Sequence, residues 1–141
     1  MRFLSQLKSK NLNGKTCLLR VDFNIDPSTS LLGQGALRLQ VVLPTIKLLL
    51  SKGSRIVILS HRGRPQGVDK TLSLKFVLPY LEKNLKQKIA FLQHVSFQNF
   101  PRQSALIQRE SARIFLMENL RFHEGEAAND LEFAKKLARL G

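Results

Sequence analysis

The sequence is poor in cysteine and in acidic residues, and it lacks a long uninterrupted apolar run. One cysteine, Cys17, among 141 residues cannot form an internal disulfide, which favours a reducing, intracellular compartment. The longest apolar stretch, residues 41–50, is interrupted by Pro44 and Lys47, so no segment is predicted to cross a membrane. The first ten residues, MRFLSQLKSK, contain too short an apolar segment for a secretory signal. These absences together predict a cytoplasmic protein.

The shortage of acidic residues makes the chain strongly basic. Its 23 Lys and Arg against 10 Asp and Glu give a net charge of +13. This charge favours an anionic partner, which can be a nucleic acid, an acidic membrane surface or a phosphorylated metabolite. The net charge alone motivates a nucleic-acid-binding module. The basic residues are spread along the chain and no nucleic-acid-binding motif is present, so this module is only the alternative function.

Familiar nucleotide and metal motifs are also missing. Residues 63–71 superficially suggest a phosphate-binding loop, but Asp69 stands where GxxxxGK[ST] needs its second glycine. The chain has no GxGxxG, and its three histidines and single cysteine are too scattered for metal-ligand spacing. Neither an isolated nucleotide site nor a metal site is predicted.

Apolar runs alternate with amphipathic segments, without repeats or an obvious linker, and this alternation predicts one α/β domain with a mostly parallel sheet. Strands are expected at residues 16–21, 56–59, 88–92 and 113–117, and helices at 37–52 and 74–85. Pro79 must lie in a first turn of the second helix or kink it. A last helix is expected to start at the capping pair Asn129 and Glu132, with Phe133, Ala134, Leu137 and Ala138 facing inward.

Polar clusters follow three of these strands. Parallel sheets bind ligands beyond the carboxyl ends of their strands, and these ends carry residues 22–24, 61–64 and 118–123. Arginine and histidine together suit a phosphate or a carboxylate, and Gly63 allows close backbone approach. Taken singly, Asp22 and Asn24 could only shape a turn, and Arg64 or Arg121 could be surface charges, with Glu118 or Glu124 as partners of Arg121. Three such strand ends on one side of a sheet favour a ligand-binding site.

Four segments, RVDFN at residues 20–24, LPTIKLLL at 43–50, SHRGRP at 60–65 and ENLRFHEGE at 118–126, resemble phosphoglycerate kinase in order and spacing. The likeness covers only the substrate-binding, N-terminal part of that family. It implies a Rossmann-like three-layer domain over residues 1–141, truncated at its C-terminal end. It also implies that the lobe binding Mg-ADP or Mg-ATP is absent, and that the protein is monomeric. Alone, the chain is expected to be inactive, and an inactive scaffold fragment is the second alternative.

The resemblance also implies roles for individual residues. His61, Arg64 and Arg121 would hold the anionic groups of 3-phosphoglycerate or 1,3-bisphosphoglycerate, and Asp22 and Asn24 would orient the glycerate. Arg38 matches the arginine that stabilises the phosphoryl group during transfer, although its surroundings, QGALRLQ, depart from the family pattern. The remaining substrate-binding residues expected are Phe23, Arg62 and Gly63. Residues expected to be structural are Arg20, paired with Asp22 or Glu118, and His94 and His123; residues 93–103 are expected to form an atypical loop.

Overall fold

A four-stranded parallel sheet forms the centre of the molecule in the computed structural model, which describes residues 4–6, 12–28, 34–93 and 100–141. Its strands are β1 (Thr16–Arg20), β2 (Arg55–Leu59), β3 (Ile89–Leu92) and β4 (Ile114–Met117), in the spatial order β1-β2-β4-β3. All three pairings are parallel. The four predicted strands are therefore confirmed, with boundaries shifted by one residue, and so is the α/β class.

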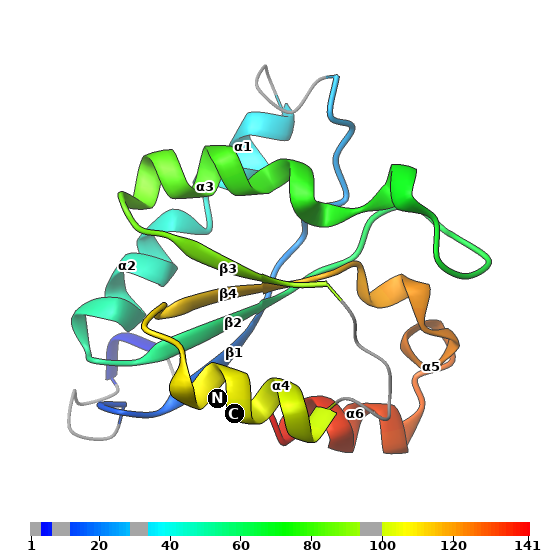
Figure 1. The fold of residues 1–141 in the computed structure, drawn as a ribbon. Helices are drawn as coiled ribbons and strands as arrows, with labels where there is room; N and C mark the ends of the chain where they lie inside the picture. Colours follow the sequence, from blue (N-terminus) through cyan, green and yellow to red (C-terminus); the bar gives the residue numbers. More distant parts are fainter. Residues whose placement is uncertain (1–3, 7–11, 29–33, 94–99) are drawn as a thin grey trace.

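The sheet is covered on both faces, which explains the continuous apolar sequences of its inner strands. Successive residues of β2 and β4 alternate between two hydrophobic clusters: Ile56, Ile58, Ile114 and Leu116 belong to one, and Val57, Leu59, Phe115 and Met117 to the other. Helices α1 (Gln34–Gln40), α2 (Leu43–Ser51) and α3 (Leu78–Leu85) cover the first face, and α4 (Phe100–Arg109) and α6 (Leu131–Ala138) cover the second (Figure 1). The short helix α5 (Glu124–Ala127) lies beyond the strand ends.

The single helix predicted at residues 37–52 is wrong, because the chain forms α1 and α2 with a turn at Val41 and Val42. Pro44 lies in the first turn of α2 and has no N–H with which to continue the hydrogen-bond ladder from α1. Arg38 therefore lies on its own short helix, next to the end of β1.

Pro79 lies in the first turn of α3, one of the two places allowed for it, and the 3₁₀ turn η4 (Leu74–Val77) precedes that helix. The expected capping pair of the last helix is wrong by one residue. Asp130 is the N-cap, and its carboxylate accepts a hydrogen bond of 2.6 Å from the Phe133 N–H. Phe133 is buried as expected, whereas Ala134 and Ala138 are exposed.

The loop expected at residues 93–103 is wrong in part, because residues 100–103 already belong to α4. His94 lies outside the described residues. No helix in the described ranges is both long and apolar enough to cross a membrane.

Candidate functional site

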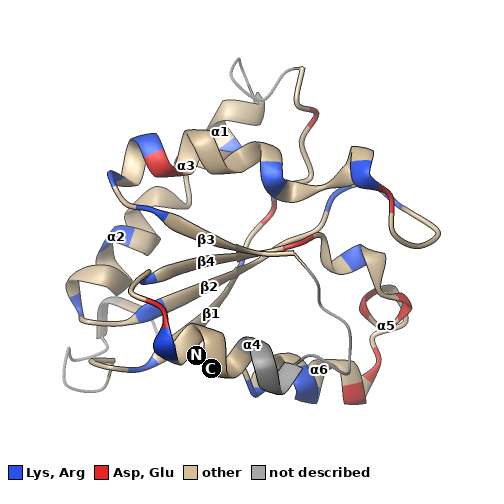
Figure 2. Ribbon diagram, viewed as in Figure 1, with Lys and Arg blue, Asp and Glu red and all other residues tan. Residues whose placement is uncertain are grey.

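The carboxyl ends of β1, β2 and β4 lie together at one edge of the sheet, because the strands are parallel and nearly in register. The segments that follow them contain the residues singled out from the sequence. Lys and Arg residues surround this edge, and acidic residues of α5 lie beside it (Figure 2).

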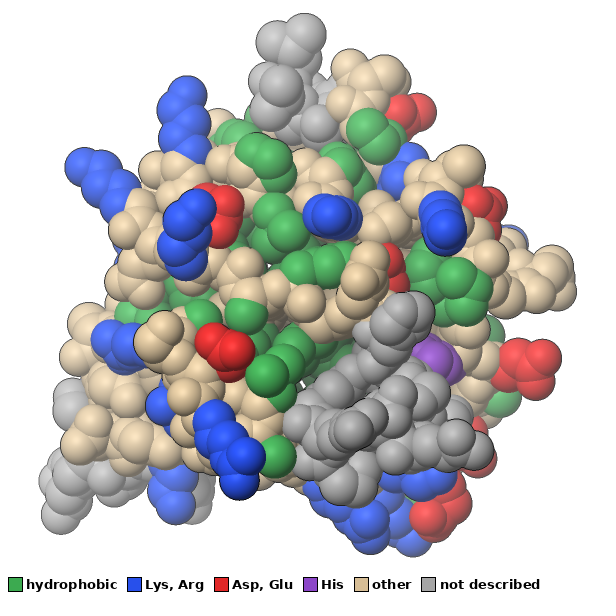
Figure 3. Space-filling model, in the orientation of Figure 1, with side chains coloured by type: hydrophobic (Ala, Val, Ile, Leu, Met, Phe, Trp, Pro, Cys, Tyr) green, Lys and Arg blue, Asp and Glu red, His purple; other side chains and the backbone are tan. Residues whose placement is uncertain are grey.

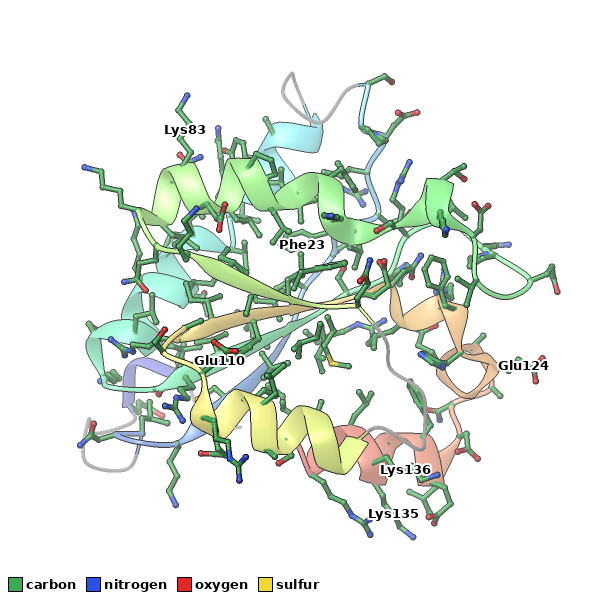
Figure 4. All side chains as sticks on the ribbon, viewed as in Figure 1. Phe23, Lys83, Glu110, Glu124, Lys135 and Lys136 are labelled. Atoms are coloured by element: carbon green, nitrogen blue, oxygen red, sulfur yellow. The ribbon has the colours of Figure 1, made fainter. Side chains whose placement is uncertain are left out.

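The segment after β1 is anchored by Phe23. The Phe23 side chain is fully buried in the core (Figure 4), and its N–H donates to the Ser60 hydroxyl at 2.9 Å. That hydroxyl donates in turn to the Val21 carbonyl, also at 2.9 Å. Phe23 thus presents no side chain to a ligand, but it holds Asp22 and Asn24 at the surface on either side.

Asp22 and Asn24 are both held in place. One Asp22 carboxylate oxygen accepts from the Asn24 N–H at 2.9 Å, so the turn-shaping role is real. The other accepts from Arg38 at 2.8 Å, and Arg38 also donates to the Asn24 carbonyl at 3.1 Å. The structure therefore brings Arg38, Asp22 and Asn24 together.

Gly63 joins the second strand end to the first. Its N–H donates to the Asn24 side-chain oxygen at 2.9 Å, and its φ of +65° lies in the left-handed region. A Cβ there would lie 2.9 Å from the Leu72 side chain. Glycine is needed at this position both for its backbone and for space.

Arg62 turns away from its neighbours in the motif. Its guanidinium donates to the carbonyls of Ile25 at 3.0 Å and Thr71 at 2.7 Å, and it lies over the Phe76 ring, 4.9 Å from the centroid. The Arg62 side chain lines a different groove from the one that Arg64 and Arg121 share. Through these contacts, Arg62 fixes the loop that follows β2.

Asn119 connects the loop after β2 to the segment after β4. It is 1% exposed, and its oxygen accepts from the N–H groups of Arg62 at 3.1 Å and Arg121 at 3.0 Å. Its amide group donates to the carbonyls of Arg62 at 2.7 Å and Leu72 at 3.0 Å. One side chain thus holds two of the three segments in fixed relation.

Glu126 on α5 joins the basic residues of the edge. Its carboxylate forms ion pairs with Arg20 and, at 3.1 Å, with Arg121. The same Arg20 nitrogen lies 3.4 Å from Nδ1 of His61, and Arg121 donates to the Gly63 carbonyl at 3.0 Å. Arg20 was expected to pair with Asp22 or Glu118, and Arg121, if a surface charge, with Glu118 or Glu124. In the structure both pair with Glu126.

The charges of this cluster affect its titrating groups. Partial burial lowers the pKa of His61 below its usual value, and the positive charges of Arg121 and Arg20 lower it further, against the opposing carboxylates of Glu126 and Asp22. Burial would raise the pKa of Glu126, but hydrogen bonds from Arg20 and Arg121 leave it below the usual value. Burial also lowers the pKa of His123, which packs against Phe133 with ring centroids 5.6 Å apart.

A groove of about 560 Å³ runs beside the cluster, between the loop at residues 64–67 and the segment at 121–128. Arg64 and Arg121 line it from opposite sides, with Gly67, His123 and Glu124 among its other residues. Its size is that of a small-molecule site. Across the ranges that the structure describes, no three His, Cys, Asp or Glu side chains are grouped to hold a metal ion.

Reasoning from the sequence did not find Arg20 and Glu126 as members of this edge. The available signal was their position, because both lie inside the segments RVDFN and ENLRFHEGE that were singled out. The partners themselves are 106 residues apart in the sequence.

Comparisons with known proteins agree on one family. The sequence model described as phosphoglycerate kinase matches residues 7–141. Phosphoglycerate kinases from Caulobacter sp. (strain K31) and from Wolbachia sp. subsp. Drosophila simulans (strain wRi) are 40% and 37% identical to the chain. These matches cover 96% and 97% of the chain, but only 34% of each relative.

Solved structures give the same result. The phosphoglycerate kinase of Coxiella burnetii superposes with a TM-score of 0.71 at 29% identity, over 96% of this chain and 32% of that one. The enzyme of Pyrococcus horikoshii OT3 superposes with a TM-score of 0.74 at 26% identity, over 99% and 35%. The chain spans about a third of the length of the curated relatives it matches.

Proposed function

The chain belongs to the phosphoglycerate kinase family, and we propose that it forms the substrate-binding part of such an enzyme, an incomplete N-terminal domain over residues 1–141. The reaction would be transfer of a phosphoryl group between 1,3-bisphosphoglycerate and ADP, giving 3-phosphoglycerate and ATP. The observation that carries this proposal is that Arg64 and Arg121 line a ligand-sized groove at one edge of the sheet. His61, next to Arg20, and Arg38, paired with Asp22, lie at the neighbouring strand ends.

The chemistry of these groups suits a small, highly charged substrate. Phosphoryl transfer asks a protein mainly for positioning and for cations near the oxygens that carry the charge. Arg64 and Arg121 can bond two oxygens each, and His61 adds a donor. Asn24 is held by the Gly63 N–H and so keeps its amide group for the glycerate.

Arg38 has the role of the transferring-group cation in this proposal. Its ion pair with Asp22 is exposed, with side-chain exposures of 45% and 58%. Such pairs contribute only about 0–1 kcal/mol, so Arg38 can leave Asp22 for a ligand at little cost.

In this proposal, Mg-ADP or Mg-ATP is held by a part of the enzyme outside residues 1–141. Among the residues that the structure describes, no three His, Cys, Asp or Glu side chains are grouped to hold a metal ion. Without the nucleotide partner, the isolated chain should catalyse no transfer, because catalysis requires both reactants held in line. Measurable turnover by the purified chain would refute this.

Binding of 3-phosphoglycerate tests the proposal directly. In ¹H–¹⁵N NMR spectra, the ligand should shift the signals of Asn24, His61, Gly63, Arg64 and Arg121 together. Arg121→Gln should weaken this binding, whereas Lys83→Gln, which removes an equal charge from α3 (Figure 4), should leave it unchanged. Shifts confined to scattered surface lysines, or equal weakening by both variants, would contradict the proposal.

Nucleic acid binding is the weaker alternative. On the face shown in Figure 3, Lys and Arg side chains are dispersed over the surface and form no continuous stripe. Binding carried by net charge alone should be weak and should fall steeply with salt. Tight, salt-tolerant binding of a DNA or RNA oligonucleotide would favour this alternative.

A further inference from the structure

Glu126 is the one acidic group that contacts two arginines of the edge, among the residues that the structure describes. Its side chain is 11% exposed, whereas those of Arg20 and Arg121 are 46% and 27% exposed. A nearly buried carboxylate is costly unless it is well paired, and here two charge-assisted hydrogen bonds provide the pairing. The arrangement is therefore a built feature and differs from an ordinary surface ion pair.

The contacts of Arg121 show what the carboxylate does. Its Nε donates to Glu126 at 3.1 Å, and its Nη1 donates to the Gly63 carbonyl at 3.0 Å. Two bonds from different nitrogens fix the plane of a guanidinium group, and arginine has five N–H donors in all. The remaining donors of Arg121 are left for a ligand in the groove that it lines.

Arg20 is held by the same carboxylate, close to His61. Without Glu126, the two guanidinium groups would repel each other and would gain freedom to move into solvent. Ordering a long side chain on binding costs conformational entropy, and the carboxylate removes that cost before the ligand arrives.

We propose that Glu126 is a positioning residue of the anion site: its carboxylate holds Arg20 and Arg121 in the arrangement that receives the anionic groups of the ligand. The identity of the ligand, 3-phosphoglycerate, rests on the proposed function. The carboxylate touches the arginines and not the ligand, so its effect is exerted through them.

Glu126→Gln tests the proposal, with Glu110→Gln as the matched control. Glu110 is an exposed carboxylate between α4 and β4, at the end of the sheet opposite to the site (Figure 4), so both variants lose the same charge. Through-space repulsion alone predicts that losing a carboxylate tightens anion binding. Positioning predicts the opposite, so the sign of the change decides between them.

Binding should be measured at about 0.15 M salt, where repulsion between exposed charges is largely screened. Ordering two arginines anew should weaken 3-phosphoglycerate binding by about tenfold in Glu126→Gln, with no change in Glu110→Gln. Unchanged or tighter binding in Glu126→Gln would overturn the proposal. The NMR spectrum of each variant verifies that it is fully folded.

Two spectroscopic readouts do not depend on the ligand. Because the Glu126 carboxylate opposes the fall in the pKa of His61, that pKa should fall further in Glu126→Gln and stay constant in Glu110→Gln. In the unsubstituted chain, the Arg121 Nε–H should exchange with water more slowly than that of the exposed Arg64. Fast Arg121 exchange would overturn the proposal even if the variant failed to fold. If the unsubstituted chain binds no 3-phosphoglycerate, the proposed function fails, and these readouts still decide the role of Glu126.

Discussion

Replacing Asn119 by alanine should destabilise the fold more than its place outside the regular elements suggests. The side chain takes part in four hydrogen bonds, with the N–H groups of Arg62 and Arg121 and with the carbonyls of Arg62 and Leu72. Since the segments involved are only partly buried, water can reach some of the groups left behind, and the loss is then about 1 kcal/mol per bond. The free energy of unfolding should fall by about 3–4 kcal/mol.

Urea unfolding followed by far-ultraviolet circular dichroism measures this change, because the chain has no tryptophan to report by fluorescence. Asn84→Ala is the matched control. Asn84 donates one bond to the Tyr80 carbonyl within its own helix, and alanine favours helix, so a change within about 1 kcal/mol is expected. Amide exchange should also accelerate at Arg62 and Arg121. A loss below about 1 kcal/mol in Asn119→Ala, with unchanged exchange, would refute the assignment of Asn119 as the connection between the two segments.

Three further predictions concern Gly63, the two described histidines and the proposed catalytic role of Arg38. Gly63→Ala should lower the free energy of unfolding by about 1–2 kcal/mol because of its left-handed backbone, and further because its new Cβ would contact the leucine of η3 (Lys70–Leu72). Gly14→Ala, where φ is +70° and the space is open, should lose only the backbone part. Equal losses of the two variants in urea unfolding would show that the contact with the leucine is relieved. Because the pKa values of His61 and His123 are lowered in the folded state, the unfolded chain binds more protons just below the ordinary value of 6.5, and stability should fall as the pH drops through that range. Urea midpoints measured from about pH 7.5 to 5.5 check this, and replacing both histidines by glutamine should flatten the profile. In an enzyme that also contains the nucleotide-binding part, Arg38→Ala should lower kcat by about a hundredfold or more, whereas His61→Ala should mainly raise KM. A near-normal kcat in Arg38→Ala would mean that the catalytic arginine lies elsewhere.

The strands were predictable because each inner strand is covered on both faces and so appears as an unbroken apolar run. The turn between α1 and α2 was not, because apolar residues continue through Val41 and Val42 at helical spacing and conceal the break at Pro44. Helix α4 was missed for the opposite reason. Its interior carries few apolar residues, and Ile107 alone of its described side chains is fully buried.

The location of the candidate site was predictable for a geometrical reason, since the ends of parallel strands meet at one edge whatever their side chains do. The partners were not predictable. Arg38 meets Asp22 across 16 residues and Arg20 meets Glu126 across 106, and such pairings depend on where the backbone places each Cα. Arg62 illustrates the same limit, because nothing in SHRGRP indicates that one arginine of the motif faces Phe76 while another lines the groove.

The strand order has a consequence for synthesis of the chain on the ribosome. β4 lies between β2 and β3, so the sheet cannot close until residues 114–117 have been made. At about 5–20 residues per second, the interval between the completion of β3 and that of β4 lasts about 1–5 s. During this time the facing edges of β2 and β3 have no strand between them, so their backbone N–H and C=O groups are open to pairing with another chain.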